Sequence, residues 1–149
     1  MAHQLHLYSL PTQTLEVRKV SSIPIDVLHE EISHAVKQKH PNLDLLCMAE
    51  DVTYEAYNYR KGMIISHGEL AGLPEFCEII QMVILQEKPL FVVRRLDAWY
   101  TEHYRAYILT TSARGILLLE HHSLADPYPL ADYTIQGRRL VVPKRYIHV

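Results

Sequence analysis

Cysteine is scarce in this 149-residue sequence: Cys47 and Cys77 are the only two, and they lie thirty residues apart. This spacing indicates no pairing: the two thiols could form a disulfide, but nothing in the sequence requires one. A chain of this length buries enough surface to fold without a metal or a disulfide. Each thiol stands in an apolar run, so both are predicted to be buried, in the reducing environment of the nucleus or cytoplasm.

Long hydrophobic runs are missing too. The longest, such as Gly115–Leu119 and Ile79–Leu85, are short and interrupted, which argues against a membrane-spanning helix. Residues 1–14 lack the basic and apolar segments of a secretory signal. An intracellular protein without membrane association is therefore expected.

Enzyme signatures are lacking as well. HEEISH (His29–His34) places its histidines five residues apart, which turns the second ring about 140° from the first on a helix and excludes the HExxH zinc motif. No serine lies in a G-x-S-x-G turn, and GELAG (68–72) lacks the lysine of a phosphate-binding loop. No catalytic residue and no cofactor are therefore predicted.

Ten histidines leave a metal-based alternative open. The adjacent His121 and His122 would point to opposite faces of a strand, so a single site could not easily use both. His122 and Asp126 could supply two ligands, and His67 or His103 a third. The alternative function is accordingly a metal-dependent hydrolase or nuclease built on these four residues.

One helix is predicted near the N-terminus, at about residues 26–40, with Asp26 as its N-cap. Acidic residues in its first turns and basic residues in its last turn match the helix dipole, and Pro41 ends it. A stripe of apolar side chains recurs at helical spacing: Leu28, Ile32, Ala35 and Val36.

After Pro41 the pattern changes to short apolar or alternating segments, whose spacing is typical of an all-β barrel or sandwich. EFCEIIQMVIL (75–85) also fits helical spacing, but its neighbours favour a strand. The predicted loops are GELAGLP (68–74), QEKP (86–89), SARG (112–115) and ADPYPLADY (125–133).

The expected fold class is mainly β (α+β), a small barrel of about six antiparallel strands with one flanking helix. Residues 57–149 would form the barrel-like domain. Residues 1–56 would form an N-terminal extension that carries the helix.

LFVVRRLDAWYTEHYRAYIL (90–109) concentrates aromatic side chains. Asp97–His103 is predicted as the loop of a hairpin, with Trp99 and Tyr100 at its tip. The favoured interpretation is that Trp99 folds back and plugs the barrel mouth. Alternatively, Trp99 is an exposed platform that stacks a base or binds a cation. An aromatic cage would form if the barrel mouth gathers Tyr57, Tyr59 and Tyr128.

The charges that give the net value of −2 are unevenly distributed along the sequence. Residues 1–87 hold twelve acidic and six basic residues, whereas residues 88–149 hold five acidic and nine basic residues. A basic C-terminal third attracts polyanions, but the balance of the whole chain is far from that of a dedicated nucleic-acid binder.

Four segments occur in a distinctive order: YRKGMIIS, GLPEFCEIIQ, LFVVRRLDAWYTEHYRAYIL and DPYPLADYTIQGRRLVVP. Across residues 57–149 the sequence resembles the C-terminal parts of long uncharacterised vertebrate proteins, numerous in fish, some of which look related to transposable elements. The resemblance implies a recurring module at the end of a larger protein, acting on chromatin or nucleic acid. It carries over no catalytic residue.

The leading prediction is a non-enzymatic interaction module that binds a protein segment or nucleic acid through this aromatic and basic loop and the adjacent strands. A second alternative is a structural module that forms homo-oligomers by pairing an exposed strand, such as Gly115–Glu120. The candidate ligand-binding residues are Trp99, Tyr100, His103, Tyr104, Arg94, Arg95, Arg105, Arg138, Arg139, Lys144 and Arg145.

Overall fold

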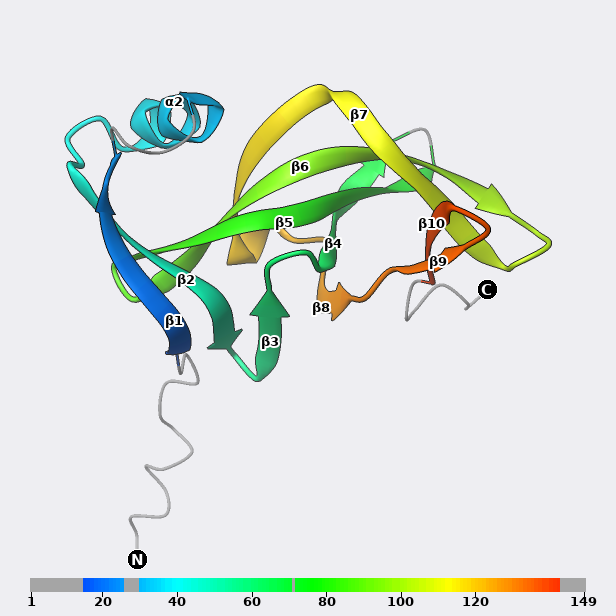
Figure 1. Ribbon diagram of the computed structural model, residues 1–149, viewed down its shortest axis with the longest axis horizontal. Helices are drawn as coiled ribbons and strands as arrows, with labels where there is room; N and C mark the ends of the chain where they lie inside the picture. The colour runs from blue at the N-terminus through cyan, green and yellow to red at the C-terminus, as the bar shows by residue number, and fades with distance from the viewer. Residues whose placement is uncertain (1–14, 26–29, 71, 143–149) are drawn as a thin grey trace, which may run out of the picture.

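The chain folds as a strongly curled antiparallel sheet with a helix packed beside it (Figure 1). The computed structural model describes residues 15–25, 30–70 and 72–142. These residues form ten strands, one α-helix and one 3-10 turn, in the following order: β1 (Leu15–Pro24), α2 (Glu30–Lys39), β2 (Leu45–Tyr54), β3 (Tyr57–Arg60), β4 (Ile64–Leu70), β5 (Leu73–Leu85), β6 (Lys88–Thr101), β7 (Ala106–Glu120), η2 (His121–Ser123), β8 (Asp126–Leu130), β9 (Tyr133–Ile135) and β10 (Arg138–Val141).

The main path of the sheet runs β1-β2-β5-β6-β7-β10-β9, while β3 pairs with β2, and β4 pairs with both β5 and β8. The long strands β5, β6 and β7 bend, so that the sheet curls into a half-barrel (Figure 1). The predicted mainly-β class with one flanking helix is confirmed. The described residues contain ten strands rather than about six, partly because ADPYPLADY, predicted as a loop, contains β8 and the start of β9.

Strands β5 and β6 are buried on both faces, which explains their nearly unbroken apolar sequences. Phe91 and Val93 belong to one apolar cluster, whereas their neighbours Leu90 and Val92 belong to a second cluster together with Val36 of α2. A strand buried on both faces has no period of two, so periodicity alone cannot distinguish it from a helix. The prediction that EFCEIIQMVIL is a strand is confirmed by β5.

Helix α2 covers the second cluster with the apolar stripe that its sequence predicts. Val36 is fully buried, and Ile32 and Ala35 pack against the cluster. The acidic first turn and basic last turn are present as expected. The proposed N-cap Asp26 and the stripe residue Leu28 lie outside the described residues. No helix in the described ranges is long and apolar enough to cross a membrane.

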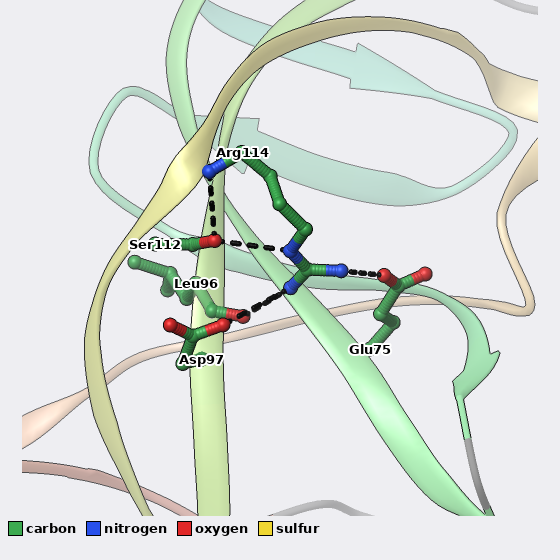
Figure 2. Close-up of polar contacts among 5 residues, drawn as sticks. All are labelled: Glu75, Leu96, Asp97, Ser112 and Arg114. Carbon is green, nitrogen blue, oxygen red and sulfur yellow. Dashed lines mark hydrogen bonds and ion pairs between the residues drawn. The ribbon is translucent and has the colours of Figure 1, made fainter.

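The segment SARG (112–115) is a bulge inside β7, and the prediction of a loop that ends a strand is wrong. Arg94 of β6 pairs with Ile116, but Leu96 pairs with Thr111, so the intervening residues of β7 leave the ladder. Figure 2 shows how side chains hold this bulge. Ser112 Oγ accepts hydrogen bonds from the backbone N and from Nε of Arg114, both at 3.0 Å.

The Arg114 guanidinium then joins the bulge to two other strands. Nη1 lies 2.5 Å from a carboxylate oxygen of Glu75 on β5, and Nη2 donates to the backbone oxygen of Leu96 on β6 at 3.2 Å (Figure 2). The guanidinium is a planar fork with several donors, so a single side chain can satisfy all these acceptors. The bulge is therefore a specified feature of the fold.

The cysteines are free thiols. Cys77 is buried in the first cluster, as predicted, and Cys47 is partly buried. Burial, with a smaller contribution from Glu75, raises the pKa of Cys77 to about 12. The thiol therefore stays protonated at neutral pH and behaves as a small apolar side chain.

Candidate functional site

Trp99 lies on a strand, not at the tip of a loop. Strand β6 continues through Thr101, so most of the predicted loop Asp97–His103 is strand. The turn itself lies between Thr101 and Ala106. Consecutive strand residues point to opposite faces, which separates Trp99 from Tyr100. Tyr100 packs edge-on against Tyr107, with the ring centroids 5.3 Å apart. The two neighbouring aromatic residues therefore contribute to different surfaces.

The indole of Trp99 is 48% exposed, so the prediction that it plugs a barrel mouth is wrong. It lines a shallow groove of about 410 Å³ together with Ile108 and Thr110 of β7 and with Arg138 and Arg139 of β10. The structure thus brings three predicted ligand-binding residues, Trp99, Arg138 and Arg139, to one place. The groove forms because β10 pairs with the part of β7 that lies opposite Trp99.

The two arginines of the groove differ in their contacts. The guanidinium of Arg139 pairs with Glu78 at 3.1 Å and with Asp132. Burial alone would lower the pKa of Arg139, but its hydrogen bonds to these two carboxylates raise it. Arg138 is exposed, and its side chain has no hydrogen bond or ion pair with any described residue. Arg138 is therefore the cation of the groove that can receive a ligand.

The other predicted ligand-binding residues do not line this groove. Arg94 and Arg95 are half-buried opposite Glu78 and Cys77 of β5. Arg95 Nε is buried without a hydrogen-bond partner in the described residues. In the turn after β6, His103 and Tyr104 contact each other edge-to-face at 4.6 Å, and Arg105 is exposed. Lys144 and Arg145 lie outside the described residues.

The tyrosines proposed for a cage gather elsewhere. Tyr57 lies 6.5 Å from Tyr59 and 6.1 Å from Tyr128, measured between ring centroids. Tyr59 is fully buried and packs against Phe91 at 4.9 Å. Among the described rings, none of these three contacts Trp99, so they do not complete an aromatic cage around it.

The histidines of the metal-based alternative do not form a ligand group. Nowhere in the described part of the chain do three or more His, Cys, Asp or Glu side chains come together in a way that could hold a metal ion. The side chain of His122 is 77% exposed and pairs with Glu120 at 3.4 Å. His121 and His122 lie in η2 and not on a strand, so the predicted alternation of these two rings does not apply.

A second cavity, which the sequence did not predict, surrounds His121. This cleft has a volume of about 460 Å³ and lies where the β2–β3 and β5–β6 turns meet the connection from β7 to β8. Both turns place two non-glycine residues in the left-handed conformation: Glu55 (φ 50°), Ala56 (φ 73°), Gln86 (φ 53°) and Glu87 (φ 63°). A two-residue hairpin turn of type I′ requires this conformation at both of its positions.

Tyr59 fixes the position of the hydrogen on the neutral His121 ring. The Tyr59 hydroxyl donates its single hydrogen to the backbone oxygen of Pro127 at 2.5 Å. Nε2 of His121 lies 3.0 Å from the same hydroxyl oxygen, so this second contact is a hydrogen bond only if Nε2 donates. Nδ1 is then left as an acceptor, 4.0 Å from a carboxylate oxygen of Glu55.

The surroundings favour the neutral form of His121. Burial lowers the pKa of His121, and His122 acts in the same direction, while Glu55 partly opposes them. Burial also raises the pKa of Tyr59, which keeps its hydroxyl protonated. Nδ1 of His121 is therefore an uncharged hydrogen-bond acceptor in a fixed position beside the carboxylate of Glu55. The contact of His121 with Tyr59 and Glu55 has no signal in the sequence, because these residues are more than sixty positions apart.

Comparison of the chain with protein-family models, with curated proteins and with solved structures finds no match.

Proposed function

We propose that this chain is a non-enzymatic interaction module, and that it binds an extended protein segment in the groove between Trp99 and Arg138. The observation that carries the proposal is an exposed indole on a strand beside an arginine that has no partner in the described residues. Trp and Arg are the residues most enriched among the energetic hot spots of protein interfaces.

The chemistry of the groove defines the segment that fits it. Trp99 offers apolar surface to an aliphatic or aromatic side chain, and Arg138 offers a cation to a carboxylate. The ring stands on β6 and the guanidinium on β10, and both strands pair with β7 between them, which reduces the entropy lost when a ligand binds. The ligand is accordingly a segment in which an acidic residue lies close to a large apolar residue.

Single-stranded nucleic acid is the competing ligand, because an exposed indole can stack a base and an arginine can contact a phosphate. The net charge of the chain, −2, supports the protein segment, since nucleic-acid binders usually carry a basic surface. The resemblance to transposon-related proteins supports the nucleic acid. The two ligands differ in salt dependence, which is steep for a polyanion.

Selection from a random peptide library on the full chain tests this proposal. The enriched peptides should share an acidic residue near an apolar one, and Trp99→Ala or Arg138→Gln should weaken their binding by roughly 1–3 kcal/mol. Arg105→Gln is the matched control, because Arg105 is an exposed arginine outside the groove. Binding that survives both groove variants, or that only mixed-sequence RNA or DNA shows, would contradict the proposal.

Self-association through β7 is a second candidate. Residues 116–120 pair with β6 on one side, and no strand among the described residues pairs with their other side. An open edge of this kind is able to pair with a second copy. Light scattering over a range of concentrations tests it: a mass that stays monomeric excludes this function.

A further inference from the structure

Two hydrogen-bond acceptors converge in the cleft beside His121. Nδ1 of His121 and a carboxylate oxygen of Glu55 lie 4.0 Å apart. No residue that the structure describes donates a hydrogen bond to Nδ1 of His121 or to the carboxylate of Glu55. Because one acceptor is neutral and the other anionic, the pair suits a cation that donates hydrogen bonds.

The separation of these acceptors matches a single nitrogen. The usual length of a hydrogen bond is about 2.9 Å. If a nitrogen lies at this distance from both acceptor atoms, the angle between them at the nitrogen is about 90°. This is roughly 20° below the tetrahedral angle between two N–H bonds of a primary ammonium group, a difference that a slight bend in each hydrogen bond accommodates. The rest of such a ligand would meet apolar walls, since Leu85, Pro89, Leu124 and Pro127 also line the cleft.

We propose that this cleft binds a primary alkylammonium group, which donates one hydrogen bond to Nδ1 of His121 and one to the carboxylate of Glu55. The aliphatic stem of the ligand packs against the leucine and proline side chains of the walls. This site is separate from the groove at Trp99. It binds a cation, whereas the groove binds a segment that carries a carboxylate.

The buried tyrosine prepares His121 for this role. Tyr59 accepts from Nε2, so the neutral ring presents its lone pair, and not its hydrogen, on the side of Glu55. The side chain of His121 is 15% exposed and that of Glu55 is 34% exposed, so the pair is partly shielded from water. Hydrogen bonds to an ionised group are stronger where water is partly excluded.

Among the described carboxylates, Glu55 is the one within ion-pair distance of His121. Glu120, at the end of β7, lies 3.4 Å from Nδ1 of the exposed His122. His40 follows α2, and Lys88 begins β6 on the same rim. Protonation of His121 turns Nδ1 into a donor and adds a positive charge, so affinity for the ammonium group falls as the pH is lowered.

Titration of the full chain with n-butylammonium, followed by NMR of the imidazole nitrogens, tests the proposal. The His121 signals are assigned by their loss in His121→Gln. The Nδ1 signal should shift saturably. n-Butyltrimethylammonium is the matched ligand control: it carries the same stem and charge but no N–H, and it should leave the signal unmoved. Equal shifts with both ions, or no shift with n-butylammonium, would overturn the proposal.

Variants then test the role of the carboxylate. Glu55→Gln should weaken n-butylammonium binding about tenfold or more, because an ionised acceptor becomes neutral. Glu120→Gln removes the same charge from the rim and should change the affinity by less than about twofold. A similar loss in both variants would show general charge attraction and overturn the proposed contact. The ligand comparison uses the unmodified chain, so it decides the question even if a variant fails to fold.

The alkylammonium group has two possible sources, a free amine or a lysine side chain. A peptide with one lysine, and the same peptide acetylated on Nζ, separate them. Tighter binding of the lysine peptide than of n-butylammonium, lost on acetylation, assigns the cleft to protein ligands. Equal or weaker binding assigns it to a free amine. Trp99→Ala should leave all these affinities unchanged, which distinguishes this site from the groove.

Discussion

Trp99 and Ile108 lie directly opposite each other on β6 and β7, yet Trp99 is 48% exposed and Ile108 only 7% exposed. Both side chains line the groove that β10 completes with Arg138. The indole therefore offers an apolar surface to a ligand while the residue across from it is already packed. Ile108 therefore supports the fold, whereas Trp99 is available for binding.

Replacing Trp99 with alanine should cost little stability. Because half of the residue remains in solvent, Trp99→Ala should lower the free energy of unfolding by less than about 2 kcal/mol, below the 3–5 kcal/mol typical of a buried aromatic residue. Urea denaturation measures this change. Phe91→Ala is the control, since Phe91 is fully buried and should show the larger loss. Equal losses would mean that Trp99 is part of the core.

The neighbouring arginines should respond differently to removal. Arg139→Ala leaves Glu78 and Asp132 without their shared cation and should destabilise the chain by roughly 1–2 kcal/mol. Arg138→Ala should change stability by less than about 0.5 kcal/mol, as exposed substitutions usually do. Thermal unfolding of both variants checks this. A larger loss for Arg138 would assign it to the fold and remove it from the groove.

Gly115 should be needed for the bulge in β7. Its φ of +82° lies in the left-handed region, so Gly115→Ala should destabilise the chain by about 1 kcal/mol. A new Cβ would meet no atom closer than 3.9 Å, so the cost would come from the backbone and not from a clash. Gly68→Ala is the matched control, because Gly68 has no left-handed φ and nothing within 4 Å of a new Cβ. It should be neutral.

Stability should depend on His121 at mildly acidic pH. Burial lowers the pKa of His121 in the folded chain below its ordinary value of 6.5. The unfolded chain then binds more protons than the folded chain in the window just below pH 6.5, so stability rises with pH there. This contribution is complete above pH 6.5 and is lost as the pH falls towards the folded pKa. In His121→Gln the pH dependence of the unfolding free energy should be shallower, whereas His122→Gln should keep most of it, because His122 is the smallest of the causes that shift the pKa of His121.

The elements that local sequence signals specify were predicted correctly. Helix α2 follows from its apolar stripe and charged ends, and the turn at Gln86–Glu87 lies within the predicted loop QEKP. The strand at EFCEIIQMVIL was identified despite its helical spacing, because its neighbours were rich in strand signals. These predictions depend on residues close in sequence.

The errors arose where distant strands decide the local structure. Residues 112–115 look like a hairpin turn, but the register of β6 against β7 on both sides turns them into a bulge that Glu75 of β5 helps to hold. Trp99 looks like the tip of a loop, but β7 extends the ladder along β6 to Thr101. The contact between Tyr59 and His121 joins residues that are far apart in the chain. No pattern in a single sequence encodes such a contact.

The most direct test of the proposed function is iodide quenching of Trp99 fluorescence, because Trp99 is the only tryptophan in the chain. In the free chain the emission should be red-shifted and readily quenched. A peptide with adjacent acidic and apolar residues should protect the indole and shift the emission to the blue, with only weak dependence on salt. A blue-shifted emission that iodide does not quench in the free chain would contradict an exposed groove. Protection by mixed-sequence RNA or DNA alone, lost at high salt, would contradict the protein segment as its ligand.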